Sequence, residues 1–219
     1  MRSSASNFLA ACFAFLAISP EATAEAPNLI VILADDLGYG DLGCQGNEVI
    51  KTPRIDRMAG EGMRFASFYV PAAQCTPTRA AFLTGCYPQR IHSHRLFNGG
   101  ELGLNPDETT IAELLKKQGY RTACIGKWHL GDHPRFHPNS HGFDEFFGFL
   151  SPSYDDKAKR LIHRNREVVA EGPESSRITD DLTDEAVAFI QANRDRRFFL
   201  YLAHDMPHVP LELPPARRG

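Results

Sequence analysis

The sequence predicts an α/β fold in which a mostly parallel sheet is sandwiched by helices. Three apolar runs, residues 28–34, 121–126 and 198–203, have the length and continuity of buried parallel strands. Segments with helical patterns lie between them, so strand, helix and strand alternate as in βαβ units. Each run also ends in polar residues, and ligand sites in this fold class form at the carboxyl ends of strands.

Length and charge narrow the classes of function. The 219 residues fit one domain of generous size. The net charge of −3 gives no basic footprint, so we expect no nucleic-acid partner.

The first residues predict export. Residues 8–18 form an apolar run that follows Arg2 and precedes Ala22-Thr23-Ala24, a small-residue cleavage pattern. We therefore predict a signal peptide over residues 1–24 and a secreted or periplasmic protein. The run is shorter than the roughly 20 residues that cross a bilayer, so no stable membrane span is expected.

The cysteines do not predict a disulfide framework. Cys12 lies within the predicted signal peptide, where it ends a string that resembles a lipoprotein box and leaves lipidation as an alternative. The remaining cysteines are too few for a disulfide scaffold and lack zinc-ligand spacing. They are Cys44, Cys75, Cys86 and Cys124.

The first strand, residues 28–34, reads as a central strand and ends in Asp35-Asp36. Two adjacent carboxylates repel each other unless a cation lies beside them, and carboxylate oxygens suit a hard ion such as Ca²⁺ or Mg²⁺. The alternative is a solvated acidic loop.

A glycine pattern follows at residues 38–43 and matches the dinucleotide-binding fingerprint G-x-G-x-x-G. A Rossmann site requires a helix to open there, but residues 44–47 have no helical periodicity. We rank nucleotide binding last and expect these glycines to let a loop pass close beneath the metal site.

Residues 52–58 predict a short helix that begins at Thr52-Pro53, and the alternation over 63–70 predicts a strand. A second short helix is predicted to begin just after Cys75, with Thr76 as its N-cap and Gly85 at its end.

The helix after Cys75 suggests chemistry. Free N–H groups at a helix start favour an anion, and Arg79 can project back to the same place. Nucleophile and anion clamp would then lie together. The alternative is a buried structural cysteine with a surface arginine.

Later elements follow the same order. Thr110 and Glu113 form a capping box for a helix that ends at Gly119, and the strand over 121–126 follows. Alternation predicts that Lys127 and His129, at its end, point to the same side. In isolation, a solvated strand end is the alternative.

The last helix and strand complete the pattern. Residues 178–193 predict an amphipathic helix with Leu182, Ala186, Val187 and Ile190 on one face. The strand over 198–203 then ends in the polar segment 204–210.

Three motifs resemble those of sulfatases. Cys-x-Pro-x-Arg at 75–79, followed by Ala-Ala-Phe-Leu-Thr-Gly, resembles the sulfatase signature, in which the cysteine is oxidised to formylglycine. Gly-Lys-Trp-His-Leu-Gly at 126–131 resembles the second conserved element, and Pro-His-Val-Pro at 207–210 resembles the element with the proton donor. Gln74 and Thr78 depart from the commonest signature and leave the subfamily open.

The resemblance implies the metal site and the nucleophile. Asp35, Asp36 and the modified Cys75 would bind a divalent cation, Ca²⁺ or alternatively Mg²⁺. Formylglycine at position 75 would be the nucleophile, and Arg79 would hold the sulfate oxygens.

It also implies the remaining site residues. Lys127, Ser153 and His208 would contact the sulfate. His129 would help to remove a proton from the nucleophile, and His208 would protonate the leaving group, with His204 as its alternative.

The resemblance further implies an alkaline-phosphatase-like fold and a sulfuric ester hydrolase of the arylsulfatase A or N-acetylgalactosamine-6-sulfatase type. Its partners would be a sulfated small molecule or glycan and a formylglycine-generating maturation enzyme. The family's later Asp-Asn pair and a further Lys have no counterpart before Gly219. We therefore expect residues 25–219 to be the truncated N-terminal part of a sulfatase catalytic domain.

Two other functions remain open. One is a phosphonate or phosphate monoester hydrolase of the same superfamily. The other is an inactive truncated fragment that binds sulfated glycans.

Overall fold

A computed structural model describes residues 26–97, 100–151, 160–171, 177–209 and 211. The predicted signal peptide and Ser153 lie outside these residues. The helices are α1 (Pro53–Glu61), α2 (Cys75–Thr84), α3 (Ile111–Lys117) and α4 (Ile178–Ala192). The strands are β1 (Leu29–Leu33), β2 (Arg121–Lys127), β3 (Glu145–Phe149), β4 (Leu161–Arg164), β5 (Glu167–Glu171) and β6 (Phe198–Ala203).

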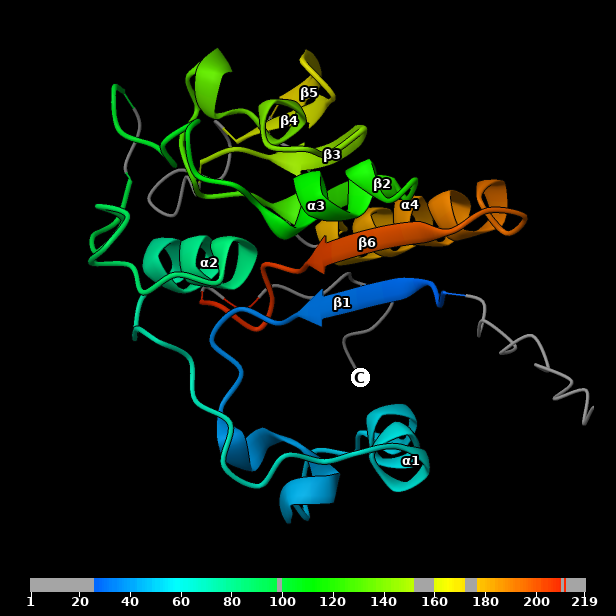
Figure 1. Ribbon diagram of the computed structural model, residues 1–219. Helices are drawn as coiled ribbons and strands as arrows, with labels where there is room; N and C mark the ends of the chain where they lie inside the picture. The colour runs from blue at the N-terminus through cyan, green and yellow to red at the C-terminus, as the bar shows by residue number, and fades with distance from the viewer. Residues whose placement is uncertain (1–25, 98–99, 152–159, 172–176, 210, 212–219) are drawn as a thin grey trace, which may run out of the picture.

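One six-stranded sheet organises the described residues, in the order β1-β6-β2-β3-β4-β5. The first four strands in this order are parallel, and β4 and β5 continue the sheet antiparallel. α2 and α3 contribute to the core on one face, and α4 packs on the other (Figure 1). The predicted mostly parallel α/β fold is confirmed.

β6 lies between β1 and β2 and is the most completely buried strand. Phe199, Tyr201 and Ala203 point into the core beneath α2 and α3, whereas the other three residues pack toward α4. A strand covered on both faces requires apolar residues at every position, which is why this run shows no polar alternation.

β1 is confirmed as a parallel strand, but its predicted central position is wrong among the described strands. It pairs with β6 on one side and forms the edge of the described sheet. Ile30 and Ile32 are 46% and 63% exposed on one face. A continuous apolar run fixes the type of element, but it does not say which strands flank it.

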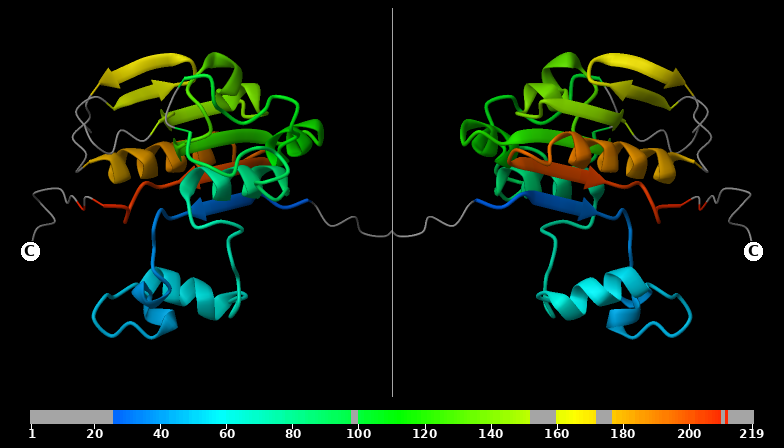
Figure 2. Two further views of the ribbon diagram at one scale, coloured as in Figure 1. Left: turned by 90° about the vertical axis from the view of Figure 1, so that its left-hand side faces the viewer. Right: turned by 90° about the vertical axis from the view of Figure 1, so that its right-hand side faces the viewer.

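The chain between β1 and α2 forms a lobe, residues 37–73, that hangs away from the sheet (Figure 2). The predicted strand over 63–70 is wrong, because this segment is extended or bent with no strand pairing. Phe65, Phe68 and Tyr69 are 64–85% exposed. Alternation alone could not supply a neighbouring strand.

The glycine pattern lies in the same lobe rather than beneath the predicted metal site. It forms two short 3₁₀ turns, η1 (Tyr39–Asp41) and η2 (Gly43–Gln45), which pack near α1. The amide of Cys44 donates to Asp56 Oδ1 at 2.7 Å. A Cβ at Gly43 would lie 2.5 Å from the Asp56 carboxylate, so this glycine permits a loop-helix contact.

The remaining helices follow their sequence signals closely. Thr110 and Glu113 form the predicted capping box at the start of α3. α4 buries Leu182 and Ala186 as expected, but Val187 is 47% exposed and Phe189 lies in the core instead.

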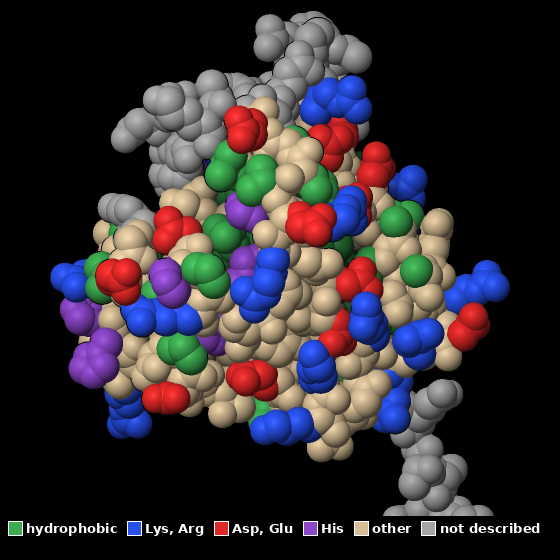
Figure 3. All heavy atoms as spheres, turned by 90° about the horizontal axis from the view of Figure 1, so that it is seen from above, with side chains coloured by type: hydrophobic (Ala, Val, Ile, Leu, Met, Phe, Trp, Pro, Cys, Tyr) green, Lys and Arg blue, Asp and Glu red, His purple; other side chains and the backbone are tan. Residues whose placement is uncertain are grey.

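The surface and the cysteines agree with the composition. Basic and acidic side chains are interspersed over the face shown in Figure 3. In the described part of the chain, Cys44, Cys75, Cys86 and Cys124 form no disulfide. Within the described ranges, no helix combines the length and the apolar character that crossing a membrane requires.

Candidate active site

Cys75 is the first residue of α2, whose N-cap lies two residues earlier than the predicted Thr76. Gln74 occupies the N-cap position, and the hydroxyl of Thr76 instead donates to the carbonyl of His129 at 2.9 Å. The predicted end is confirmed, since Gly85 closes the helix with φ 68°. The sulfur of Cys75 therefore lies at the positive end of a ten-residue helix.

Asp35, Arg79 and Lys127 form a buried ionic cluster, although they come from three separate elements. Arg79 Nη2 lies 3.2 Å from Asp35 Oδ1, and Lys127 Nζ lies 2.5 Å from Asp35 Oδ2. Lys127 Nζ is also 3.4 Å from Cys75 Sγ. All three charged side chains are at most 6% exposed. The structure thus brings Cys75, Arg79 and Lys127 to one place, while their roles as nucleophile and anion clamp stay predictions.

The electrostatics of this cluster favour an anion. Burial by itself would raise the pKa of Asp35, but Arg79 and Lys127 outweigh it and hold this pKa below its ordinary value. Two cations, Arg79 and Lys127, contact this one carboxylate in a largely buried setting. Together they can also contact an incoming oxyanion.

Backbone geometry at the end of β2 brings Lys127 into place. Gly126 has φ 112°, and a Cβ there would lie 1.9 Å from the carbonyl oxygen of Ala203 on β6. Only glycine lets the two strands approach so closely at this point. β2 then ends at Lys127.

His129 reaches the cluster by a different route from the predicted alternation. Its φ of 56° is left-handed, so the period of a strand does not extend to it. The side chain is buried, and burial together with the charges of Lys127 and Arg79 lowers its pKa to about 3. The imidazole of His129 is therefore neutral beside these two cations.

Asp36 and His208 form the open side of the site. His208 Nε2 lies 3.3 Å from Asp36 Oδ2, with side-chain exposures of 18% and 58%. Asp36 has φ 61°, which turns it away from the strand direction of Asp35. The predicted alternative proton donor, His204, is half-buried, and burial lowers its pKa.

Ligand atoms of Asp35, Cys75 and His208 all lie within 4.8 Å of one another. This set overlaps the predicted metal ligands in Asp35 and Cys75, whereas Asp36 lies at its rim through its contact with His208. Thiolate and imidazole suit a soft ion, but an oxygen in place of the sulfur would make the donors suit a hard cation. These residues therefore fit Ca²⁺ or Mg²⁺ best when Cys75 is oxidised.

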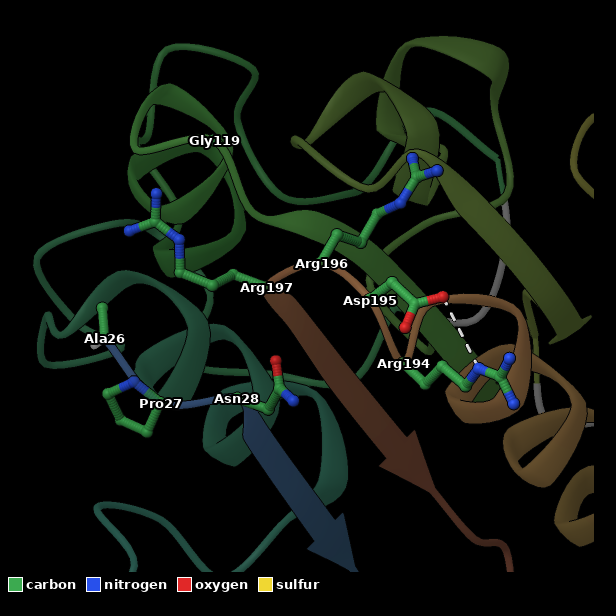
Figure 4. Close-up of a pocket in the computed structure, with 8 residues that line it drawn as sticks. All are labelled: Ala26, Pro27, Asn28, Gly119, Arg194, Asp195, Arg196 and Arg197. Carbon is green, nitrogen blue, oxygen red and sulfur yellow. Dashed lines mark hydrogen bonds and ion pairs between the residues drawn. The ribbon is translucent and has the colours of Figure 1, made fainter.

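A cavity of about 210 Å³ opens beside Asp35, Cys75 and Arg79. A larger hollow of about 630 Å³ lies at the amino ends of β1 and β6, where Arg194, Arg196 and Arg197 surround it (Figure 4). None of the predicted site residues lines that hollow. The predicted site residues Asp35, Asp36, Cys75 and Arg79 line the smaller cavity instead.

Sequence reasoning missed a second buried ion pair near this edge, between Arg160 and Asp205. Asp205 lies just beyond β6, so the rule of polar residues after strands could have indicated it. Arg160 precedes β4, a strand that the sequence analysis did not predict. No motif in the neighbouring sequence indicates this arginine.

Comparison with known proteins places the chain in a family. The family model described as Sulfatase matches residues 27–217. N-acetylgalactosamine-6-sulfatase of Mus musculus is 42% identical over 214 residues, which cover 85% of this chain and 41% of that protein. Arylsulfatase G of Homo sapiens is 36% identical over 239 residues, covering 92% and 46%.

Solved structures agree. The crystal structure of Ps i-CgsB has a TM-score of 0.78 and 39% identity, and the match covers 85% of this chain and 46% of that one. A sulfatase structure from Bacteroides thetaiotaomicron has a TM-score of 0.79 and 29% identity, covering 87% and 53%. The chain thus spans less than half the length of the curated relatives named above. Family match, fold and signature together show that this chain belongs to the sulfatase family, with the alkaline-phosphatase-like fold.

Proposed function

We propose that the protein hydrolyses sulfate monoesters through a formylglycine derived from Cys75, with a divalent cation bound beside it. The observation that carries the proposal is the cluster at the start of α2. There Lys127 contacts both Asp35 and Cys75, and Arg79 contacts Asp35 from the other side. Two buried cations next to a nucleophile suit the transfer of a sulfuryl group.

Asp35, Asp36 and the oxidised Cys75 would hold the cation, for which Ca²⁺ is our first choice and Mg²⁺ the alternative. When bound, the cation polarises the sulfate oxygens, and the hydrated aldehyde supplies a hydroxyl nucleophile. Oxygen donors at all three positions agree with the preference of hard ions.

The chain's own residues would do the rest. Arg79 and Lys127 bind the sulfate oxygens and stabilise charge that develops on them. His129, kept neutral, accepts a proton from the nucleophile, and His208 donates one to the departing alcohol oxygen. Ser153, which lies outside the described residues, remains a predicted sulfate contact.

For the substrate we propose a sulfated glycan. Ps i-CgsB was solved in complex with k-i-k-neocarrahexaose, at 39% identity to this chain. BT4656, at 31% identity, was solved in complex with its substrate D-glucosamine-2-N,6-O-disulfate. The signal-peptide pattern of residues 1–24 further supports a secreted or periplasmic location, and a maturation enzyme would oxidise Cys75.

The test compares three esters: 4-nitrophenyl sulfate, a sugar 6-O-sulfate and a 4-nitrophenyl phosphonate. The protein is purified from its own host as wild type, Cys75→Ala and Cys86→Ala. Cys75→Ala removes the nucleophile and should lower kcat on the sulfate esters by on the order of 10⁶-fold. Cys86 is a half-buried thiol just beyond α2, and Cys86→Ala should leave kcat unchanged. Equal rates for Cys75→Ala and wild type would refute the proposal, and faster phosphonate than sulfate turnover would favour the superfamily alternative.

Two measurements check the cofactors separately from activity. The mass of the tryptic peptide from Phe65 to Arg79 should show an aldehyde in place of the thiol. Calorimetry should show Ca²⁺ binding that Asp35→Asn abolishes. A thiol in protein from its own host would contradict the modification.

A further inference from the structure

The buried ion pair of Arg160 and Asp205 lies at the same edge of the sheet as the candidate site, but it has no role in the proposed chemistry. Arg160 Nη1 contacts Asp205 Oδ2 at 2.8 Å, and the two side chains are 2% and 5% exposed. The guanidinium also lies 4.1 Å above the ring of Phe149. The pair is therefore fixed in both distance and orientation.

The Asp205 end of the pair leads directly to His208. The amide of His208 donates to the carbonyl of Asp205 at 3.2 Å, which closes a turn over residues 205–208. Within that turn, the carbonyl of Met206 accepts from the amide of Asp35 at 3.2 Å. Asp205 is thus the anchored first residue of the turn that presents His208 beside Asp35 and Asp36.

The Arg160 end is held by the strands next to Lys127. Phe149, beneath the guanidinium, is the register partner of Lys127 in the β2–β3 ladder. The carbonyl of Phe149 accepts from the amide of Trp128 at 3.0 Å. Arg160 therefore ties the His208 turn to the strand end that carries Lys127.

A buried ion pair often stabilises a protein less than apolar side chains of similar volume would, because desolvation offsets much of the attraction between the charges. Such a pair does, however, fix one arrangement of the two side chains. We propose that Arg160, acting through Asp205, positions His208 to protonate the departing oxygen of the substrate. This inference rests on the sulfatase activity proposed above.

The proposal has a chemical signature that distinguishes it from general structural support. The proton moves from the His208 ring nitrogen to the bridging oxygen while the bond between sulfur and that oxygen breaks and a bond forms between sulfur and the nucleophilic oxygen at position 75. A sugar alkoxide is a strong base and needs this proton, whereas 4-nitrophenolate departs readily without it. Poor positioning should therefore slow sugar sulfates much more than aryl sulfates.

The experiment measures kcat and KM for 4-nitrophenyl sulfate and a sugar 6-O-sulfate in the protein from its own host. Asp205→Asn keeps the shape but removes the charge, and Arg160→Lys keeps the charge but removes the planar fork. Arg164→Lys is the matched control, because Arg164 also stacks on a phenylalanine and pairs with Glu185, but on the exposed surface.

For Asp205→Asn we expect kcat on the sugar sulfate to fall about 10- to 100-fold, a fraction of the 10²–10⁴ that general acid catalysis contributes. The aryl sulfate should change less than threefold, with KM unchanged for both esters, and Arg160→Lys should show a smaller loss of the same kind. In a His208→Ala background, Asp205→Asn should add nothing. The control should match wild type.

Equal losses on the two esters, or losses that add to that of His208→Ala, would overturn the positioning role while leaving the sulfatase proposal intact. A wild-type protein that hydrolyses neither sulfate would overturn both. Circular dichroism confirms folding first. If Asp205→Asn does not fold, Arg160→Lys decides the question with the charge retained.

Discussion

Two buried ionic clusters lie at the carboxyl edge of the sheet, and they differ in their balance of charge. In the first, Arg79 and Lys127 both contact Asp35, so two cations share one carboxylate. In the second, Arg160 faces Asp205, one charge against one. Burial is almost complete in both. By these contacts among the described residues, we call the first cluster unbalanced, because it has one more cation than carboxylate, and the second balanced.

This difference in charge distinguishes a cluster suited to binding a ligand from a pair that fixes the geometry of the fold. An unbalanced buried charge lowers stability and is tolerated where a ligand supplies the missing charge. A balanced pair fixes geometry. Charge balance, rather than burial, therefore supports the first cluster as the one proposed to bind the substrate.

The largest expected effect is on stability, at the balanced pair. Arg160→Met leaves Asp205 buried without its counter-charge and should lower the free energy of unfolding by about 3–5 kcal/mol. Replacing both partners, Arg160→Met with Asp205→Leu, should recover most of this loss because no buried charge then remains. Urea denaturation at pH 7 measures both. A double variant as unstable as the single one would show that the pair does more than balance charge.

The unbalanced cluster should respond in the opposite way. Lys127→Met should lower kcat on sulfate esters by about 10²–10³, the usual effect of losing one preorganised charge. In this variant Asp35 still contacts Arg79 at 3.2 Å, so the free energy of unfolding should change much less than for Arg160→Met. Steady-state kinetics and urea midpoints on the same preparations provide the check. Large instability with intact kcat would reverse our assignment of the two clusters.

A third buried polar group, His137, extends the comparison to the pH dependence of stability. Burial, with the charge of Arg166, lowers the pKa of His137 to about 4. An unfolded histidine takes up its proton near pH 6.5, so the unfolded state binds more protons between pH 6.5 and 4 and stability falls as pH falls. Between pH 6.5 and pH 5, the wild type should lose about 1.6 kcal/mol of unfolding free energy relative to the His137→Asn variant.

His137→Asn is the comparison variant, since asparagine also accepts a hydrogen bond at the cap position that His137 occupies. Urea midpoints of both proteins across this range report the difference, in which the shared carboxylates cancel. Parallel curves would contradict a neutral buried His137.

The smallest effect should come from a balanced pair that is exposed. Arg57 and Glu61 pair at 3.5 Å on α1 with 65% and 69% exposure. Arg57→Ala should change the free energy of unfolding by about 0.3–0.5 kcal/mol, and 1 M salt should remove the effect. A loss as large as that of Arg160→Met would mean that solvent does not screen the lobe.

Residues whose partners are close in sequence, or that end an apolar run, were predictable. The capping box of Thr110, the limits of β6 and the polar ends of three strands all follow from local patterns. The grouping of Asp35, Lys127 and His208 follows from the rule that parallel strands end at one edge, whereas the place of Cys75 beside them was implied only by the resemblance.

What the sequence could not supply depends on tertiary neighbours. β1 is an edge strand because of what pairs with it, and residues 63–70 have no partner strand in the described part of the chain. Thr76 looks like an N-cap, but it turns to the carbonyl of His129, a contact 53 residues away. Arg160 gave no signal because its partner lies 45 residues later.

The central place of β6 sets an order of events during synthesis. β1 and β2 meet only through β6, the last of the six strands to leave the ribosome. Until then Asp35 and Lys127 stay apart and the walls around Cys75 are unfinished. At 5–20 residues per second, the roughly 120 residues from Cys75 to Phe198 take about 6–25 s to make. For that interval, the nascent chain offers its Cys75 thiol to any enzyme that reads an extended segment, before the fold closes over it.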